Sequence, residues 1–180
     1  MRIQMALIAA SALALTACGS PGGDADSDGD GVVTAEEAQA LNASAADEIK
    51  PLPGKYKVDM QFVKAEGLPE EMQSMMGSSM TNSTEFCLTP EMADSGFGQM
   101  AQQDDDSCTI DRYVIDGNDM DMAMSCSPAG TPTPMEMTMS GTVSPTKSDM
   151  TMVSKGMFPG MAEASVEMRV TQERIGDCDG

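Results

Sequence analysis

The sequence predicts a mainly β (α+β) fold over most of the 180-residue chain, an antiparallel meander or sandwich-like sheet with short helices. Two observations predict it. Short segments of alternating apolar and polar residues follow one another from residue 54 onwards, separated by turns rich in glycine, proline, asparagine and serine. A hairpin signal, Asp116-Gly117-Asn118-Asp119, lies between two of these segments. Short strands joined by short turns favour antiparallel neighbours with helices covering one face.

The first strand is predicted from residue 54 to Phe62, because every second residue from Tyr56 onwards is apolar. A helix from Leu68 to Met76 follows, since Pro69 lies at its start and methionines recur at helical spacing. The later elements, in chain order, are a strand over 84–88, a helix from Pro90 towards Met100, an acidic loop over 102–106, and strands over 109–115, 120–126, 135–143, 149–155 and 164–175.

Four of the five cysteines form an even set, as expected for disulfides in an oxidising compartment. Reflecting the chain about Gly117 in the hairpin turn sets residue 108 against residue 126, so we predict the bridge Cys108–Cys126. The bridge Cys87–Cys178 follows by elimination. Each bridge adds about 3 kcal/mol of stability by restricting the unfolded chain. No Cys-x-x-Cys motif is present, which argues against a redox-active pair.

The fifth cysteine, Cys18, lies at the end of an export signal. Residues 1–17 combine Arg2 with an apolar run over 5–15 that is too short to span a bilayer. The ending Leu15-Thr16-Ala17-Cys18 resembles a bacterial lipobox, in which the cysteine thiol is diacylated and becomes the new N-terminus. Several acyl chains make such an anchor stable. Because Gly19 follows the cysteine, we expect a lipoprotein of the outer membrane that faces the periplasm or the exterior.

The composition excludes several classes of function. The formal net charge of −19 disfavours binding to nucleic acid and to anionic lipid faces. The chain has no histidine, which removes the usual general base and the usual zinc ligand. We therefore expect a protein that is not an enzyme and has no catalytic residues. Its partners are expected to be the membrane, through the lipid, and a protein that the sequence does not specify.

The most specific short motif is a twelve-residue EF-hand calcium loop over 26–37, which follows a glycine-rich stretch over 18–25 expected to be a flexible tether. Gly31 lies at the sixth position, where the chain must bend sharply. Ca²⁺ suits the loop because it is a hard cation that takes six to eight oxygen ligands. The expected ligands are Asp26, Asp28, Asp30, the carbonyl of Val32, Thr34 and Glu37.

The loop has half of the usual EF-hand frame. An exiting helix is predicted over 34–50, ending before Pro51, whereas Pro21-Gly22-Gly23 excludes an entering helix. Val33 would normally pair with a second loop, and the sequence has no second copy. We therefore expect weak affinity, about 10⁻⁴–10⁻³ M. The alternative is a solvated acidic tether. We also expect residues 26–50 to be independent of a disulfide-linked β domain over 52–178, so that calcium affects only residues 24–50.

Twenty methionines are the second unusual feature. Many fall at alternate positions, which places them on one face of a sheet. Core filling is the favoured interpretation, because the chain has few aromatic residues and methionine fills irregular space. One alternative is Cu(I) binding by thioethers. Another is a hydrophobic ligand such as an acyl chain, held against a methionine-lined face.

The C-terminal part carries several short motifs: Gly54-x-Tyr56, Cys87-Leu88-Thr89, the pair Cys108 and Cys126, the Met-x-Met strands, and the ending Arg174-Ile175-Gly176-Asp177-Cys178. With these motifs it resembles the proteobacterial envelope family known as domain of unknown function 3617 (DUF3617). The resemblance covers roughly residues 52–178. It implies a small secreted or lipidated domain with paired cysteines and no assigned activity, and the calcium loop lies outside it.

The lipid anchor leads to the first testable prediction. Replacing Cys18 by Ser removes the thiol that accepts the lipid, so the variant is expected to accumulate as an unlipidated precursor. Metabolic labelling with a fatty acid, followed by membrane fractionation, measures this directly. Normal labelling and normal membrane association of Cys18→Ser would show that this cysteine is not the anchor.

Overall fold

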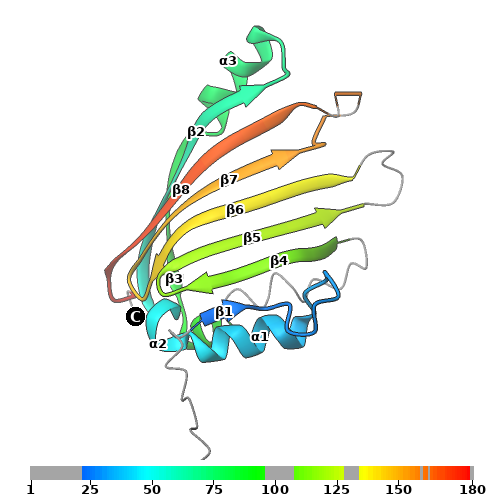
Figure 1. Cartoon of the computed structure of the whole chain (residues 1–180). Helices are drawn as coiled ribbons and strands as arrows, with labels where there is room; N and C mark the ends of the chain where they lie inside the picture. Colours follow the sequence, from blue (N-terminus) through cyan, green and yellow to red (C-terminus); the bar gives the residue numbers. More distant parts are fainter. Residues whose placement is uncertain (1–21, 96–107, 128–133, 159, 162, 179–180) are drawn as a thin grey trace, which may run out of the picture.

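The structure is a computed structural model and describes residues 22–95, 108–127, 134–158, 160–161 and 163–178. These residues form one eight-stranded antiparallel sheet with the strand order β1-β4-β5-β6-β7-β8-β2-β3. The mainly β prediction is therefore confirmed, as a single curved sheet (Figure 1). The strands are β1 Gly22–Asp24, β2 Gly54–Glu66, β3 Asn82–Leu88, β4 Cys108–Asp116, β5 Asp119–Cys126, β6 Met135–Ser144, β7 Lys147–Lys155 and β8 Ser165–Gly176.

Strands β4 to β8 form a meander in which each strand pairs with the next. At one end, β2 pairs with β8 and β3 pairs with β2; at the other end, β1 pairs with β4. The predicted strand ends agree with the structure to within a few residues except in β2. That strand continues past Phe62 through a bulge, and its extension brings Ala65 into a buried cluster with Ala164 and Val166.

Short helices flank the sheet: α1 Ala35–Ser44, α2 Ala46–Ile49, α3 Glu70–Ser79 and α4 Pro90–Ser95. The single helix predicted over 34–50 is wrong in one respect, because it is interrupted at Ala45. The Ser44 hydroxyl donates to the Leu41 carbonyl at 2.7 Å and so shares this acceptor with the Ala45 N–H, whose 3.0 Å bond is the last regular helical bond of α1. The predicted extension of the Pro90 helix towards Met100 and the acidic loop over 102–106 lie outside the described residues.

One face of the sheet, here called the apolar face, carries methionines that lie opposite one another on neighbouring strands. Met122 pairs with Met139, Met139 with Met152, and Met152 with Met168. Helix α1 covers part of this face, and Met120, Met122 and Met150 there are only 2%, 4% and 5% exposed. Core filling by methionine is thus confirmed for these three residues. At the far end of β2 and β8, Met72 and Met76 of α3 pack, together with Phe62 and Met168, against the buried cluster that contains Ala65.

The β4–β5 hairpin depends on a tight turn and a bulge. Gly117, with a φ of +60°, suits the first central position of a type II′ turn, and this turn pairs Asp116 with Asp119. In that register Cys108 would face Ser127. A bulge between Ile110 and Arg112 shifts the pairing by one residue, and Cys108 lies opposite Cys126 instead. The sequence argument about Gly117 reaches the right pair, but it does so only because this bulge exists.

Both predicted disulfides are present in the structure. Cys108–Cys126 joins β4 to β5 with a Cα–Cα distance of 3.9 Å. Cys87–Cys178 joins β3 to the segment after β8 with a Cα–Cα distance of 5.6 Å. The first bridge closes the open end of one hairpin, whereas the second ties the last strand of the sheet order to the C-terminal end of the chain.

The N-terminal expectations need correction. Residues 22–24, assigned to a flexible tether, form strand β1, because their backbone pairs with Val114, Ile115 and Asp116 of β4. The separation into two independent parts is also wrong, since the stripe Ala38, Leu41, Ala45 and Ile49 is buried against the apolar face. Residues 1–21, which include the predicted signal and Cys18, lie outside the described residues. No helix in the described ranges is long and apolar enough to cross a membrane.

A buried tyrosine joins helix α1 to the sheet and leads to the second prediction. The Tyr113 hydroxyl donates to Asn42 Oδ1 at 2.6 Å, and burial raises the pKa of Tyr113 to about 12, partly offset by that bond. Burial also raises the pKa of Tyr56. Because folding favours the neutral phenol, the stability from Tyr113 is complete below pH 10 and is lost as the pH rises towards about 12.

The chain has two tyrosines and no tryptophan, so ultraviolet absorbance follows tyrosinate formation without interference. We expect ionisation above pH 10 in the folded protein and near pH 10 in denaturant. Tyr113→Phe is the control that identifies the higher step. Titration of both folded-state tyrosines at the denatured-state value would contradict the buried contact with Asn42.

Candidate metal centre

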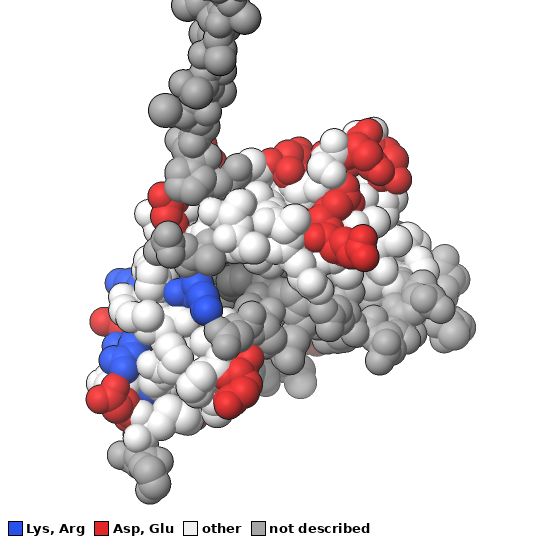
Figure 2. Space-filling view, turned by 90° about the horizontal axis from the view of Figure 1, so that it is seen from below, with Lys and Arg blue, Asp and Glu red and all other residues white. Residues whose placement is uncertain are grey.

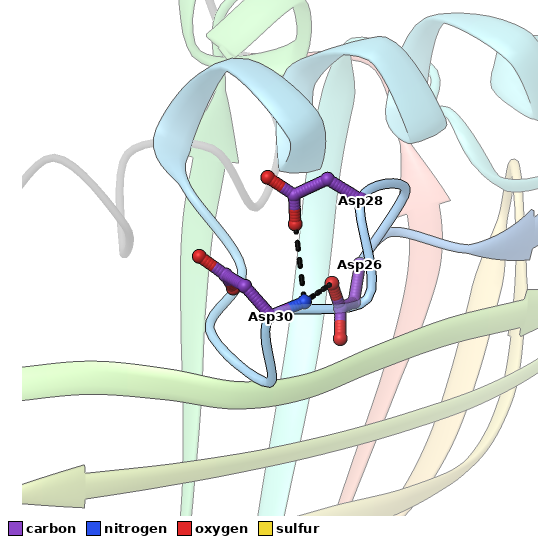
Figure 3. A group of neighbouring side chains, drawn as sticks. All are labelled: Asp26, Asp28 and Asp30. Carbon is purple, nitrogen blue, oxygen red and sulfur yellow. Dashed lines mark hydrogen bonds between the residues drawn. The ribbon is translucent and has the colours of Figure 1, made fainter.

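The carboxylates of Asp26, Asp28 and Asp30 converge in the loop that connects β1 to α1. Each offers one oxygen, and these three oxygens lie within 4.8 Å of one another. The two-residue spacing produces this convergence because the backbone turns continuously between them (Figure 3). The side chains are exposed or half-buried, so a cation can reach them from solvent. Three oxygens of this kind form part of a ligand set for a hard divalent cation.

The loop backbone is wrapped around Asp26. Its Oδ1 accepts hydrogen bonds from the Gly29 and Asp30 N–H groups at 2.8 and 3.1 Å, and its Oδ2 accepts one from Gly31 N–H at 3.0 Å. Gly31 has a φ of +86°, which side chains rarely tolerate. The sharp bend predicted at this sixth loop position is therefore present, and it turns the N–H groups towards the first carboxylate.

The other two aspartates fix the following residues of the loop. Asp28 Oδ1 accepts from Asp30 N–H at 3.2 Å, and Asp30 Oδ1 accepts from Val32 N–H at 2.8 Å. These bonds partly neutralise carboxylates that would otherwise repel one another at close range. A bound cation would remove that repulsion.

The structure places Glu37 differently from its predicted role as a two-oxygen ligand. Its Oε1 accepts from the N–H and hydroxyl of Ser27 at 3.1 and 2.8 Å. Its Oε2 accepts from the N–H and hydroxyl of Thr34 at 2.9 and 2.8 Å. Thr34 is the N-cap of α1, and the two residues form a capping box. Glu37 is not in the converging group, and the carboxylate would have to leave Ser27 and Thr34 to bind a cation there.

The hydrogen bonds to Glu37 also set its ionisation. The bond from the Thr34 N–H has the largest effect, with Ser27 contributing, and together these bonds lower the pKa of Glu37 to about 2. The carboxylate is therefore charged at any physiological pH. Ser27, at the second loop position, had no assigned role in the sequence interpretation. Its contact with Glu37 joins the two ends of the loop, and short-range pattern alone does not indicate it.

Strand β4 supplies a contact that the sequence does not reveal. The Val33 N–H donates to the Ile110 carbonyl at 2.8 Å, which forms an isolated bridge between the loop and β4. The Ala25 N–H donates to the Tyr113 carbonyl, also at 2.8 Å. Val33 was expected to have no pairing partner, because no second calcium loop exists. Its partner is Ile110 of β4, more than seventy residues away.

The charge around the loop is dominated by acidic groups. The chain carries 29 acidic and 10 basic side chains. Seen from below, the described surface shows acidic side chains in several separate groups, and its visible basic side chains gather towards one end (Figure 2). This distribution favours the approach of cations to the loop.

The fold and this loop define a mainly β protein with an open antiparallel sheet and an acidic loop held against its edge. The model of the family described as protein of unknown function (DUF3617) matches residues 51–178, which is more than half of the chain. The chain belongs to the DUF3617 family. No curated protein and no solved structure gives a significant match.

The residues that carry the family resemblance hold the fold together at the β2–β8 pairing. A Cβ at position 54 would lie 2.6 Å from the Gly176 carbonyl oxygen, so only glycine fits there. The Arg174 guanidinium donates to the Pro53 carbonyl at 2.9 Å, and the Tyr56 hydroxyl donates to the Leu52 carbonyl at 2.8 Å. These are strand-end contacts, and they give the motif a structural role.

Proposed function

We propose that this DUF3617 protein is a calcium-binding lipoprotein of the bacterial cell envelope with a structural or interaction role. The observation that carries the calcium assignment is the convergence of Asp26, Asp28 and Asp30 within a loop that also has glycine at the required bend. Oxygen ligands in a turning loop suit Ca²⁺ better than softer metals. A non-catalytic role is supported by the lack of histidine in the chain.

The lipobox at Cys18 supports anchoring to the outer membrane. Strand β1 begins at Gly22, four residues further along. Four extended residues span at most about 14 Å. The edge of the sheet and the calcium loop would then lie close to the membrane surface, since the tether is shorter than the eight residues that the sequence suggests. An acidic loop near anionic headgroups is a place where divalent cations concentrate.

Calcium titration of the mature chain lacking Cys18 tests this function. Asp26→Ala and Glu37→Gln are each expected to weaken Ca²⁺ binding by more than about tenfold, because affinity follows the charge of the ligand set. Glu37→Gln keeps a side chain that suits the capping box, so α1 is expected to remain helical by circular dichroism.

Glu36→Gln is the matched control, since it removes the same charge from the neighbouring residue in the first turn of α1. It is expected to bind Ca²⁺ nearly as well as the parent chain. If Glu36→Gln and Glu37→Gln weakened Ca²⁺ binding equally, the loss of affinity would come from the lower net charge and not from a lost ligand. If the parent chain did not bind Ca²⁺ at millimolar concentration, the loop would be an acidic connector and not a calcium site.

A second candidate function is Cu(I) binding, and the strand register is the observation that favours it. Met139, Met152 and Met168 lie in one row across β6, β7 and β8, and each is only partly buried. Thioethers on neighbouring strands come close enough to share a soft cation. Met139 and Met168 also pack against the buried clusters, but all three residues of the row keep part of their surface exposed.

Titration with Cu(I) in the presence of a competing chelator tests this candidate. The variant Met139→Leu/Met152→Leu/Met168→Leu keeps side-chain volume while removing the thioethers, so it is expected to fold and to lose Cu(I) binding. Met75→Leu is the control, because Met75 lies outside the row and is 71% exposed. Binding that survives the triple substitution would eliminate the row as a copper site.

A further inference from the structure

We propose that strand β4 takes the place of the missing second EF-hand loop, so that calcium binding and the folding of the sheet edge form one cooperative unit. This inference rests on the proposed calcium site and specifies how that site is regulated. It makes the ion a structural element of the β domain. It also replaces the expectation that calcium acts only on residues 24–50.

The first support is that the loop is attached to β4 at two points. Residues 25 and 33 bracket most of the loop, and their N–H groups donate to the Tyr113 and Ile110 carbonyls. In a regular strand, carbonyls three residues apart point to opposite edges. The bulge between Ile110 and Arg112 alters this pattern, and both carbonyls face the outer edge of β4. The bulge that aligns the cysteines therefore also creates the docking points for the loop.

The second support is the hydrophobic packing that continues from these bonds. Val33 is 4% exposed and belongs to the same buried cluster as Ile110, Tyr113 and Leu41. Its neighbour Val32 is 42% exposed. The eighth loop position is thus buried in the sheet core, while the seventh, whose carbonyl is a predicted ligand, is exposed to solvent.

The third support is the position of Glu37. This residue lies in the first turn of α1, and the later turns of the same helix are buried against the sheet through Ala38, Leu41 and Ala45. The hydrogen bond between Tyr113 and Asn42 fixes the helix further. A movement of α1 away from the sheet would expose this core, which opposes the helix opening of a calcium sensor. Calcium is therefore expected to leave α1 on the sheet, with only the Glu37 side chain exchanging its bonds to Ser27 and Thr34 for the ion.

Reciprocity follows from these contacts. If calcium stabilises the loop against β4, then an intact contact between loop and β4 must raise the affinity for calcium by the same factor. The missing entering helix would ordinarily leave the loop poorly supported. Here β1 and β4 provide that support, because β1 leads into the loop as part of the sheet.

The test uses the mature chain lacking Cys18, with Ca²⁺ as the ligand. Val33→Ala reduces the buried contact with Ile110 and leaves every predicted ligand in place. Val32→Ala is the matched control, because it makes the same substitution at the adjacent exposed residue and keeps the carbonyl. We expect Val33→Ala to weaken Ca²⁺ binding about five- to tenfold by calorimetry, a usual size for coupling between sites. Val32→Ala is expected to change it less than twofold.

Amide spectra of the parent chain provide the second readout. Calcium is expected to shift the amides of Ile110 and Tyr113 together with those of the loop, and to slow hydrogen exchange along β4. Should Val33→Ala fail to fold, Tyr113→Phe provides the same test, because it removes the bond to Asn42 and keeps the ring in the core. It too is expected to weaken Ca²⁺ binding.

The outcomes separate the two proposals. Calcium binding with shifts confined to residues 24–50, and equal affinities for Val33→Ala and Val32→Ala, would overturn the coupling while leaving the calcium site intact. An absence of binding by the parent chain would overturn both. Shifts that reach β4, together with selective weakening by Val33→Ala, would support the coupling.

Discussion

The outer edge of strand β4 is the part of the molecule on which the arrangement of the rest depends. An edge strand presents unpaired N–H and carbonyl groups, which must be covered or bonded. In this protein β1, Ala25 and Val33 occupy that edge in turn. Their bonds bring the acidic loop to the sheet and direct the chain into α1. Without that pairing, the stripe of α1 that covers Tyr113 and Met122 would have no fixed position.

The core is adapted to a chain with few aromatic residues. Four Phe and two Tyr, with no Trp, cannot fill the space above an eight-stranded sheet. Methionine fills it instead, since an unbranched thioether adapts to irregular gaps. The buried tyrosines are placed where their hydroxyls find partners, Tyr56 at the Leu52 carbonyl and Tyr113 at Asn42. Because packing of this kind is adaptable, the specific arrangement of the fold depends largely on the strand register and on the two disulfides.

The acidic loop and the sheet support each other through different forces. Hydrogen bonds from the backbone hold the three aspartates together against their own repulsion. The buried contacts of Val33 and α1 hold the whole loop on the sheet. The loop is therefore organised by the fold, and a cation would add to an arrangement that already exists. This combination suits a structural ion better than a switch, because little of the surrounding structure is free to move.

The sequence by itself determined the strands of the β domain and the acidic loop, because each depends on local pattern. Both cysteine pairs were also predicted from it, one from the hairpin turn and the other by elimination. Alternation from Tyr56 to Phe62 marks a half-buried strand whatever its partner. The tertiary structure decided the rest. It set the strand order, the bulge near Asp111 and the pairing of Val33 with Ile110. The strand order and this pairing bring together residues that are far apart in the chain. Such pairings leave no periodic signal. They arise because an exposed strand edge needs partners for its backbone groups, and because an apolar helix stripe is more stable when it is buried against the sheet.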